Sequence, residues 1–330
     1  MKGLHKVLIG AISSCFIVST PFAATKWNMA TGYPDSTYHT ENVRWFAEKV
    51  KEATNGELVI EVHSGASMFK APELKRAVRT GQVQLAEYVL SFYGNEDALY
   101  EADTMPFLAV GSAEAAKLYE IQKPMLAERF KKEGLVPLYS VLWPGNGLYL
   151  NHEASSGADL ASAKIRAPGP VVAKLTELLG AIAVNVQFVE VPQAFSTGVI
   201  NGMFTAASNG VDMKAWEFVS NFYDFSAYHP RNIVAVNARA WNSLSEDTQK
   251  KVLEVAKQAE ERGWRLTDEL QAKAAIELNE GGVKVHKPSE QLVADFKKAS
   301  DQLIQEWVKR AGKDGERIVE EMTAFKEAKN

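Results

Sequence analysis

The chain has 330 residues, enough for about two domains of ordinary size. Hydrophobic residues make up 46% and charged residues 24%, which are usual values for a globular protein with a core and exclude a disordered or collagen-like chain. The single cysteine excludes cysteine-based zinc modules, iron–sulfur clusters and a disulfide framework. The net charge of -4 gives no basic surface for a polyanion, so nucleic acid is not an expected partner.

The N-terminal segment predicts export. Lys2 and Lys6 precede an apolar run over residues 7–18, which is shorter than the roughly 18 to 20 residues that span a bilayer. A basic start, a short apolar run and small residues after it are typical of a secretory signal peptide, assigned here to residues 1–23. An alternative is a lipoprotein cleavage box at Ile12-Ser13-Ser14-Cys15. Removal of the signal peptide would remove the only cysteine, which suits the oxidising periplasm or the cell exterior.

Hydrophobic periodicity in the first hundred residues alternates between strand and helix. Apolar residues from Val43 to Val50 recur at helical spacing, whereas apolar and acidic residues alternate from Glu57 to Val62 as in a strand. The expected elements are a strand at 26–30, a helix at 41–54, a strand at 58–62, a helix at 72–80 and a strand at 83–88. This alternation predicts a mostly parallel sheet covered by helices.

The same order of elements returns in the second half of the chain. The expected elements are a strand at 164–166, a helix at 170–179, a strand at 182–186, a helix at 192–197 and a strand at 202–205. A helix ends at Thr-Gly and a strand follows it both at Thr80-Gly81 and at Thr197-Gly198. Two similar α/β lobes are therefore expected.

The C-terminal third is predicted to be mainly helical. After a strand at 232–236, a charged and alanine-rich helix is expected over residues 246–278. That helix is longer than one lobe needs, so it would brace both lobes. Ser289 is expected to cap a helix over 295–309, and an amphipathic helix starts near residue 316. Because no low-complexity linker separates the lobes, the chain is expected to cross between them more than once.

Motifs for catalysis or cofactor binding are nearly absent from the sequence. The six histidines do not lie at metal-chelating spacing, and there is no HExxH, GxGxxG, Walker-type or Gly-x-Ser-x-Gly motif. Ser67-Met68-Phe69-Lys70 is an SxxK motif of the kind found in secreted serine acyl-enzymes, but the KTG and SDN motifs that accompany it there are missing. We therefore expect a binding protein rather than an enzyme, with no metal and no cofactor.

Several short segments along the chain form a recognisable series. They are, in order, Phe46–Val50, Thr54–Gly56, Ala77–Gly81, Asp103–Leu108, Asp159–Pro168, Leu179–Ala181, Val189–Ala194, Gly198–Gly202 and Ala240–Leu244. This series resembles the solute-binding proteins of tripartite ATP-independent periplasmic (TRAP) transporters, the DctP-like family. The common order and spacing of the segments, rather than any single one, carry the resemblance.

The resemblance implies an α/β, two-lobed periplasmic-binding-protein type II fold with the ligand cleft between the lobes. Residues 24–143 and 231–270 would form lobe I, and residues 144–230 and 271–330 would form lobe II. It also implies a periplasmic receptor that closes on a small organic carboxylate and delivers it to the small and large membrane subunits of a TRAP permease. Three other functions remain open: the binding protein of an ATP-driven importer, a secreted enzyme using the SxxK motif, and a sensor.

Arg166 is the expected anchor of the ligand. It ends a short predicted strand, where side chains project into the crevice at the carboxyl ends of strands, and a guanidinium can bind a carboxylate with two hydrogen bonds. The resemblance assigns carboxylate binding to this position. Asn146 stands where sialic-acid-binding members have a second arginine, which favours a monocarboxylate with a nearby hydroxyl or keto group over sialic acid or a dicarboxylate. Asn146 could instead be a turn residue of its Asn-Gly pair.

Other contacts follow from the resemblance and from residue type. Phe188 matches an aromatic residue that packs on the ligand, or else it is a core residue. Glu87 and Tyr88 would contact the ligand from lobe I, and Glu87 could instead form a hinge salt bridge. Further polar contacts and aromatic walls would complete a cleft for a small ligand: Thr205, Ser208, Asn209, Tyr33, Tyr38 and Trp143.

Overall fold

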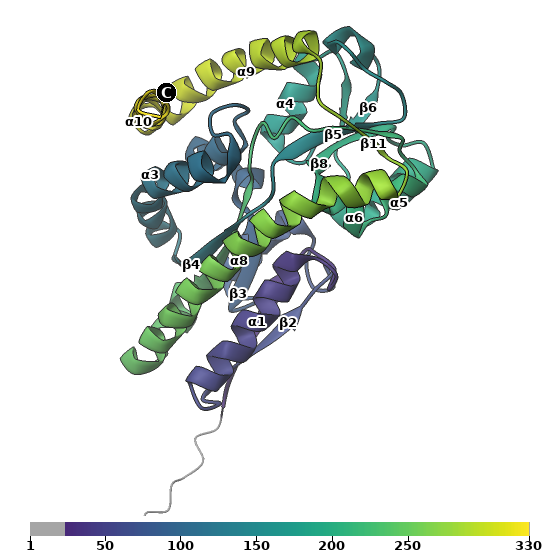
Figure 1. Cartoon of the computed structure of the whole chain (residues 1–330). Helices are drawn as coiled ribbons and strands as arrows, with labels where there is room; N and C mark the ends of the chain where they lie inside the picture. Colours follow the sequence, from purple (N-terminus) through teal and green to yellow (C-terminus); the bar gives the residue numbers. More distant parts are fainter. Residues whose placement is uncertain (1–23, 330) are drawn as a thin grey trace, which may run out of the picture.

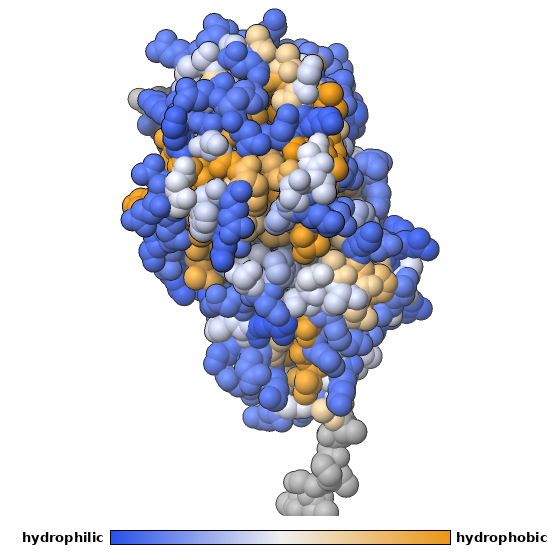
Figure 2. All heavy atoms as spheres, turned by 90° about the vertical axis from the view of Figure 1, so that its right-hand side faces the viewer, coloured by the Kyte–Doolittle hydropathy of each residue, from blue (hydrophilic) through white to orange (hydrophobic). Residues whose placement is uncertain are grey.

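The computed structural model describes residues 24–329, so the predicted signal peptide at residues 1–23 lies outside the described residues. The strands form two separate sheets, and each sheet with its helices makes one lobe of a two-lobed α/β molecule (Figure 1). Hydrophilic residues cover most of the face shown in Figure 2, with apolar residues in smaller patches between them. Within residues 24–329, no helix combines the length and the apolar character that a membrane crossing needs.

The first sheet has five strands in the order β2-β1-β3-β10-β4. These strands are β1 (Thr25–Thr31), β2 (Leu58–His63), β3 (Leu85–Val89), β4 (Leu135–Leu142) and β10 (Arg231–Asn237). β1 pairs in parallel with β2 and β3, whereas β10 pairs antiparallel with both β3 and β4. The helices that pack in this lobe are α1 (Tyr38–Ala53), α2 (Leu74–Thr80), α3 (Gly111–Lys132) and α7 (Ala238–Asn242).

The second sheet has six strands in the order β11-β9-β5-β8-β6-β7. These strands are β5 (Asn146–Leu150), β6 (Lys164–Arg166), β7 (Ile182–Val184), β8 (Gly202–Ala206), β9 (Asn221–Tyr223) and β11 (Lys284–His286). β6 pairs in parallel with β7 and β8, and β11 pairs in parallel with β9. β5 is antiparallel to both β8 and β9. The helices of this lobe are α4 (Pro170–Leu178), α5 (Val191–Ser196) and α6 (Ala207–Asp212).

Each sheet is mostly parallel, as expected, and has a single strand that runs antiparallel to the others. In each sheet the antiparallel strand is one that follows a passage of the chain from the other lobe: β5 comes after β4, and β10 comes after β9. Two parallel neighbours within one lobe need a crossover connection, usually a helix. A strand that arrives from the other lobe needs no such connection, so it is free to run antiparallel.

The chain passes between the lobes repeatedly, as the sequence predicts. The first passage is at residues 143–145, the second at residues 224–230, and the third is the helix α8 (Glu246–Glu280). α8 packs on α1 and β4 in the first lobe and on α6 and β11 in the second, and Figure 1 shows it running along both. The expectation of a long bracing helix is therefore confirmed. Gly263 allows its close approach to β4, because a Cβ there would lie 2.5 Å from Val141 Cγ2.

The two last helices pack across both lobes. α9 (Glu290–Ala311) packs on α4, and α10 (Lys313–Glu327) packs on α3. Ser289 caps α9 as predicted, because its Oγ accepts a hydrogen bond of 3.1 Å from the amide of Leu292. Since α3 belongs to the first lobe, the assignment of all of residues 271–330 to lobe II does not describe α10.

Candidate functional site

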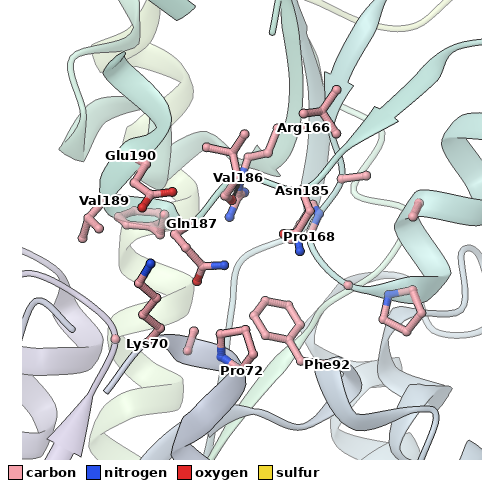
Figure 3. Close-up of a pocket in the computed structure, with 18 of the residues that line it drawn as sticks. Lys70, Pro72, Phe92, Arg166, Pro168, Asn185, Val186, Gln187, Val189 and Glu190 are labelled. Atoms are coloured by element: carbon pink, nitrogen blue, oxygen red, sulfur yellow. Dashed lines mark hydrogen bonds between the residues drawn. The ribbon is translucent and has the colours of Figure 1, made fainter. Parts of the chain in front are cut away.

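Two adjoining cavities lie between the lobes. The outer cavity has a volume of about 620 Å³ and the inner one about 50 Å³. In Figure 3, Pro72 and Phe92 of the first lobe lie opposite Arg166 of the second, and Lys70 points toward the segment of Gln187. Five residues line both cavities: Tyr33, Phe92, Arg166, Pro168 and Phe188. The cavities therefore occupy the inter-lobe cleft that the sequence predicts.

Arg166 lies in the wall of both cavities at the end of β6, and only 5% of it is exposed. Its Nε donates to the carbonyl oxygen of Val186 at 3.0 Å, and its Nη1 donates to that of Phe204 at 3.4 Å. No carboxylate of residues 24–329 pairs with it. Burial lowers the pKa of Arg166 to about 10, against the opposing effect of Tyr33 and Tyr228, so the guanidinium is charged at neutral pH. A buried cation without a counter-ion is a site for an anion.

The inner cavity also has polar groups from the second lobe. Asn209 Nδ2 donates to Thr205 Oγ1 at 2.7 Å, and Asn209 Oδ1 is buried without a hydrogen-bond partner among the described residues. The hydroxyl of Tyr228 is likewise buried and unpartnered within the described chain. Asn146 lines the same cavity, and its Nδ2 donates to the carbonyl oxygen of Pro144 at 3.3 Å. Because buried polar groups are normally hydrogen-bonded, these atoms favour a small polar ligand.

Aromatic rings from both lobes surround the inner cavity. The ring of Tyr33 meets that of Trp143 edge-on at a centroid distance of 5.1 Å, and that of Phe188 edge-on at 5.7 Å. Tyr33 follows β1, Trp143 follows β4 at the first passage between the lobes, and Phe188 begins a 3₁₀ turn that leads into α5. The walls therefore combine flat apolar surfaces with the polar atoms that orient a ligand.

Four of the expected contact residues do not line either cavity: Glu87, Tyr88, Ser208 and Tyr38. Successive side chains of a strand point to opposite faces, so Glu87 and Tyr88 in β3 cannot both face the cleft. Tyr88 instead packs edge-on against Tyr93 at 5.3 Å in the core of the first lobe. Tyr38 is buried at the start of α1 and donates its hydroxyl to the carbonyl oxygen of Leu142.

The carboxylate of Glu87 is occupied by protein groups. Thr31 Oγ1 donates to Glu87 Oε2 at 2.7 Å, and His39 Nδ1 lies 3.1 Å from Glu87 Oε1. Glu87 and His39 are both at most 1% exposed. Burial lowers the pKa of His39, although Glu87 opposes this, so the imidazole is neutral at pH 7. Glu87 is therefore held by hydrogen bonds within the first lobe, to a hydroxyl and to a neutral imidazole, which is neither a ligand contact nor the salt bridge expected as its alternative.

Several residues that line the inner cavity are not among the contacts predicted from the sequence. They include Phe92, Val172 and Tyr228. Phe92 lies in a 3₁₀ turn after β3, and Tyr228 lies in the second passage between the lobes, so neither belongs to a periodic segment. An aromatic residue at a predicted passage between lobes was the one available signal for Tyr228. His39 and Asn232, which lie behind the cavity wall, were also not predicted.

The SxxK motif is not arranged for catalysis. Ser67 is exposed, and the described residues show no hydrogen bond between it and Lys70, although a nucleophile needs its base within reach. Lys70 lies in the wall of the outer cavity instead. In residues 24–329, no group of three or more histidine, cysteine, aspartate or glutamate side chains could hold a metal ion.

Comparison with known proteins gives a consistent result. A family model described as bacterial extracellular solute-binding protein, family 7 (DctP), matches residues 29–310. The crystal structure of DctP7 from Bordetella pertussis, an extracytoplasmic solute receptor binding pyroglutamic acid, shares 38% identity and a TM-score of 0.89, covering 91% of this chain and 100% of that one. A marine metagenome TRAP solute-binding protein specific for pyroglutamate shares 32% identity and a TM-score of 0.89, covering 92% of this chain and 100% of that one.

A third similar protein is more distant in sequence. The monocarboxylate 2-oxoacid-binding periplasmic protein of Nostoc sp. is 24% identical over 312 residues, which are 91% of this chain and 84% of the relative. All three similar proteins are described as receptors or binding proteins, and none is described as an enzyme.

Proposed function

Because the chain belongs to family 7 of the bacterial extracellular solute-binding proteins, we propose that it is a periplasmic receptor for pyroglutamate. Two receptors described as binding pyroglutamate share 38% and 32% of their sequence with it, whereas the 2-oxoacid-binding relative shares 24%. Pyroglutamate is also the kind of ligand that the cleft favours, a small monocarboxylate with a second polar group.

The unpaired guanidinium of Arg166 is the observation that carries this proposal. It is buried and charged in the wall of the inner cavity, and no carboxylate of the described chain neutralises it. A ligand carboxylate would accept charge-assisted hydrogen bonds from it, which are stronger than bonds between neutral groups. A single arginine in the inner cavity supports a monocarboxylate over a dicarboxylate.

The remaining polar atoms of the inner cavity suit the lactam ring. Pyroglutamate carries a ring N–H and a ring carbonyl beside its carboxylate. In the proposed complex, Asn209 Oδ1 accepts from the ring N–H, and the hydroxyl of Tyr228 donates to the ring carbonyl. The apolar faces of the ring contact the aromatic walls of Tyr33 and Phe188.

Closure of the cleft would complete the site. Arg166 and Asn209 come from the second lobe, while Tyr33 and Phe92 come from the first, so only a closed form makes every contact. A ligand that binds the closed form better shifts the population toward it. In this proposal the small and large membrane subunits of a TRAP permease then take the ligand from the closed receptor, after export directed by residues 1–23.

The test is calorimetric titration of receptor that has been unfolded and refolded to remove any co-purified ligand. We expect L-pyroglutamate to bind, and Arg166→Ala to weaken binding by about 30-fold or more, since truncating one partner of a buried charge pair costs roughly 2 kcal/mol or more. Two analogues separate the contributions: 2-pyrrolidinone lacks the carboxylate, and cyclopentanecarboxylate lacks the lactam. Both should bind more weakly than pyroglutamate.

Arg265→Ala is the matched control, because Arg265 is exposed on α8 away from the cleft. It should bind pyroglutamate like the unsubstituted receptor. Each variant is melted without ligand to verify its fold. A folded Arg166→Ala variant with undiminished affinity for pyroglutamate would contradict the proposed anchor. A folded, unsubstituted receptor that does not bind pyroglutamate would contradict the proposed ligand.

A further inference from the structure

A buried set of polar side chains lies behind the wall of the inner cavity. It consists of Thr31 at the end of β1, His39 in α1, Glu87 in β3 and Asn232 in β10, and is called here the Glu87 network. Each of the four residues is at most 1% exposed. Glu87 accepts from Thr31 at 2.7 Å and lies 3.1 Å from His39 Nδ1, which in turn lies 3.2 Å from Asn232 Nδ2. The network therefore joins three strands and a helix of the first lobe.

Asn232 connects this network to two residues that line the inner cavity. Its Oδ1 accepts from the indole N–H of Trp143 at 2.9 Å and from the hydroxyl of Tyr33 at 3.3 Å. An indole nitrogen can only donate, so the bond to Trp143 fixes which end of the Asn232 amide is oxygen. The amide nitrogen must then face His39. The rings of His39 and Trp143 are also in contact, with centroids 3.9 Å apart.

The network can hold the cavity wall because it holds the His39 ring. With its hydrogen on Nδ1, His39 donates to Glu87 Oε1, so the same nitrogen cannot accept from the Asn232 amide, which only packs beside it. The ring held in this way lies against the Trp143 ring and against the Asn232 amide. Without Glu87 the ring is free to shift, and the support behind Trp143 and Asn232 is lost.

We propose that the Glu87 network is a positioning device for ligand binding, which keeps Tyr33 and Trp143 in the conformation that the ligand needs. Glu87, His39 and Asn232 act through these two residues and line neither cavity themselves. The ligand part of this inference rests on the proposed binding of pyroglutamate, so the test has one arm that needs no ligand.

The first arm compares two substitutions of Glu87 by titration with L-pyroglutamate. Glu87→Leu removes the polar atoms at similar volume, and we expect it to weaken affinity by about tenfold, the loss typical of a hydrogen bond to a charged group. Glu87→Gln keeps an acceptor for His39, so it should bind within about threefold of the unsubstituted receptor. An equal loss in both variants would show that the charge of Glu87 acts on the ligand directly and would overturn the proposal.

The second arm records the indole N–H resonances of ¹⁵N-labelled protein without ligand. Trp143→Phe assigns the Trp143 resonance, which should move in Glu87→Leu and stay in place in Glu87→Gln. Trp307, whose indole donates to the carbonyl oxygen of Ala98, serves as the distant reference and should not move in either variant. A Trp143 resonance unmoved by Glu87→Leu would overturn the proposal. If the unsubstituted protein fails to bind pyroglutamate, the proposed ligand fails while this arm still decides the positioning role.

A double-mutant cycle separates positioning from a general loss of stability. If Glu87 acts through the wall, Glu87→Leu combined with Tyr33→Phe should weaken binding about as much as the larger single effect. A double variant whose loss of affinity is the product of the two single losses would show independent roles and overturn the proposal.

Should Glu87→Leu fail to fold, His39→Phe/Glu87→Leu replaces it in every arm, because removing both partners of a buried pair leaves neither unpaired.

Discussion

Thr205 Oγ1 accepts a hydrogen bond of 2.7 Å from Asn209 Nδ2, and this bond holds the Asn209 amide in the wall of the inner cavity. The amide nitrogen is thereby used within the protein, and the oxygen is left without a partner among the described residues. Asn209 therefore offers an acceptor, rather than a donor, to a ligand that would be anchored at Arg166. Ligands with an N–H beside the carboxylate are favoured by this arrangement.

Selectivity for the lactam N–H follows from that acceptor. The γ-lactone analogue of pyroglutamate has a ring oxygen in place of the N–H and leaves Asn209 Oδ1 unpaired. We expect it to bind about tenfold more weakly than pyroglutamate or worse. Thr205→Val frees the amide and should reduce this ratio, whereas Thr205→Ser keeps the hydroxyl and should preserve it. Competition titration gives the ratio of the affinities for pyroglutamate and for the lactone in each variant. Equal affinities in the unsubstituted receptor would show that Asn209 does not bind the ring N–H.

Replacement of Arg166 by lysine tests geometry separately from charge. Lysine keeps the positive charge but loses the planar fork and the bond to the carbonyl oxygen of Val186. We expect Arg166→Lys to weaken pyroglutamate binding by about tenfold, less than Arg166→Ala does. Titration calorimetry of both variants checks the order. If lysine binds as tightly as arginine, the charge alone suffices and the fork has no role.

Gly263 is expected to be required for the packing of α8 on the first lobe. Gly263→Ala would place Cβ 2.5 Å from Val141 Cγ2 and 3.1 Å from Asn42 Nδ2. Overpacking of this kind costs about 1–3 kcal/mol, which exceeds the helix-propensity gain of about 1 kcal/mol from alanine.

Urea unfolding should therefore show a lower free energy of unfolding for Gly263→Ala. Gln258→Ala on the exposed face of the same helix is the control and should be neutral or slightly stabilising. A Gly263→Ala variant that is as stable as the unsubstituted protein would mean that α8 does not approach β4 so closely.

Stability is expected to depend on pH through His229. Its Nε2 accepts from the amide of Gly111 at 2.9 Å, and burial lowers its pKa, against the opposing effect of the Trp143 carbonyl. As the pH falls through about 6.5, His229 becomes protonated in the unfolded chain but stays neutral in the folded protein. The free energy of unfolding should therefore decrease below that pH, by up to about 1.4 kcal/mol per pH unit.

His229→Gln should remove this contribution, because the glutamine side chain can accept from Gly111 without titrating. His39 acts in the same direction, while Asp103, whose pKa burial raises to about 6 against the effect of Arg231, acts in the opposite one. The comparison is therefore the difference between the variant and the unsubstituted protein, measured by urea unfolding at pH values of about 5, 6 and 7. A difference that does not change with pH would show that His229 does not titrate differently on folding.

The sequence allows the elements with clear periodicity to be predicted. α8 was expected over residues 246–278 and spans Glu246–Glu280, and the strand that ends at Arg166 was placed correctly. β5 was not predicted, because all five of its residues are buried and it shows no apolar–polar alternation. α3 was also not predicted, and it contains Pro124, which usually marks the end of a helix.

The candidate site was predictable to the extent that residue type and a strand end define it. Seven of the expected residues line the inner cavity: Tyr33, Trp143, Asn146, Arg166, Phe188, Thr205 and Asn209. Tyr88 lines neither cavity, and the sequence could not show this because the direction of side chains along β3 depends on its register. The sequence gives no signal for His39, because its partners Glu87 and Asn232 lie 48 and 193 residues away in the chain.

The strand order of the first sheet also governs the sequence of events during synthesis. β10 lies between β3 and β4 and bonds to both, yet it is made after every strand of the second sheet except β11. A chain that has been synthesised only to residue 230 therefore has β4 with no neighbour in its sheet and β3 with one side open. Unpaired strand edges of this kind attract other chains. The nascent protein thus remains dependent on protection of these edges until its last third has emerged.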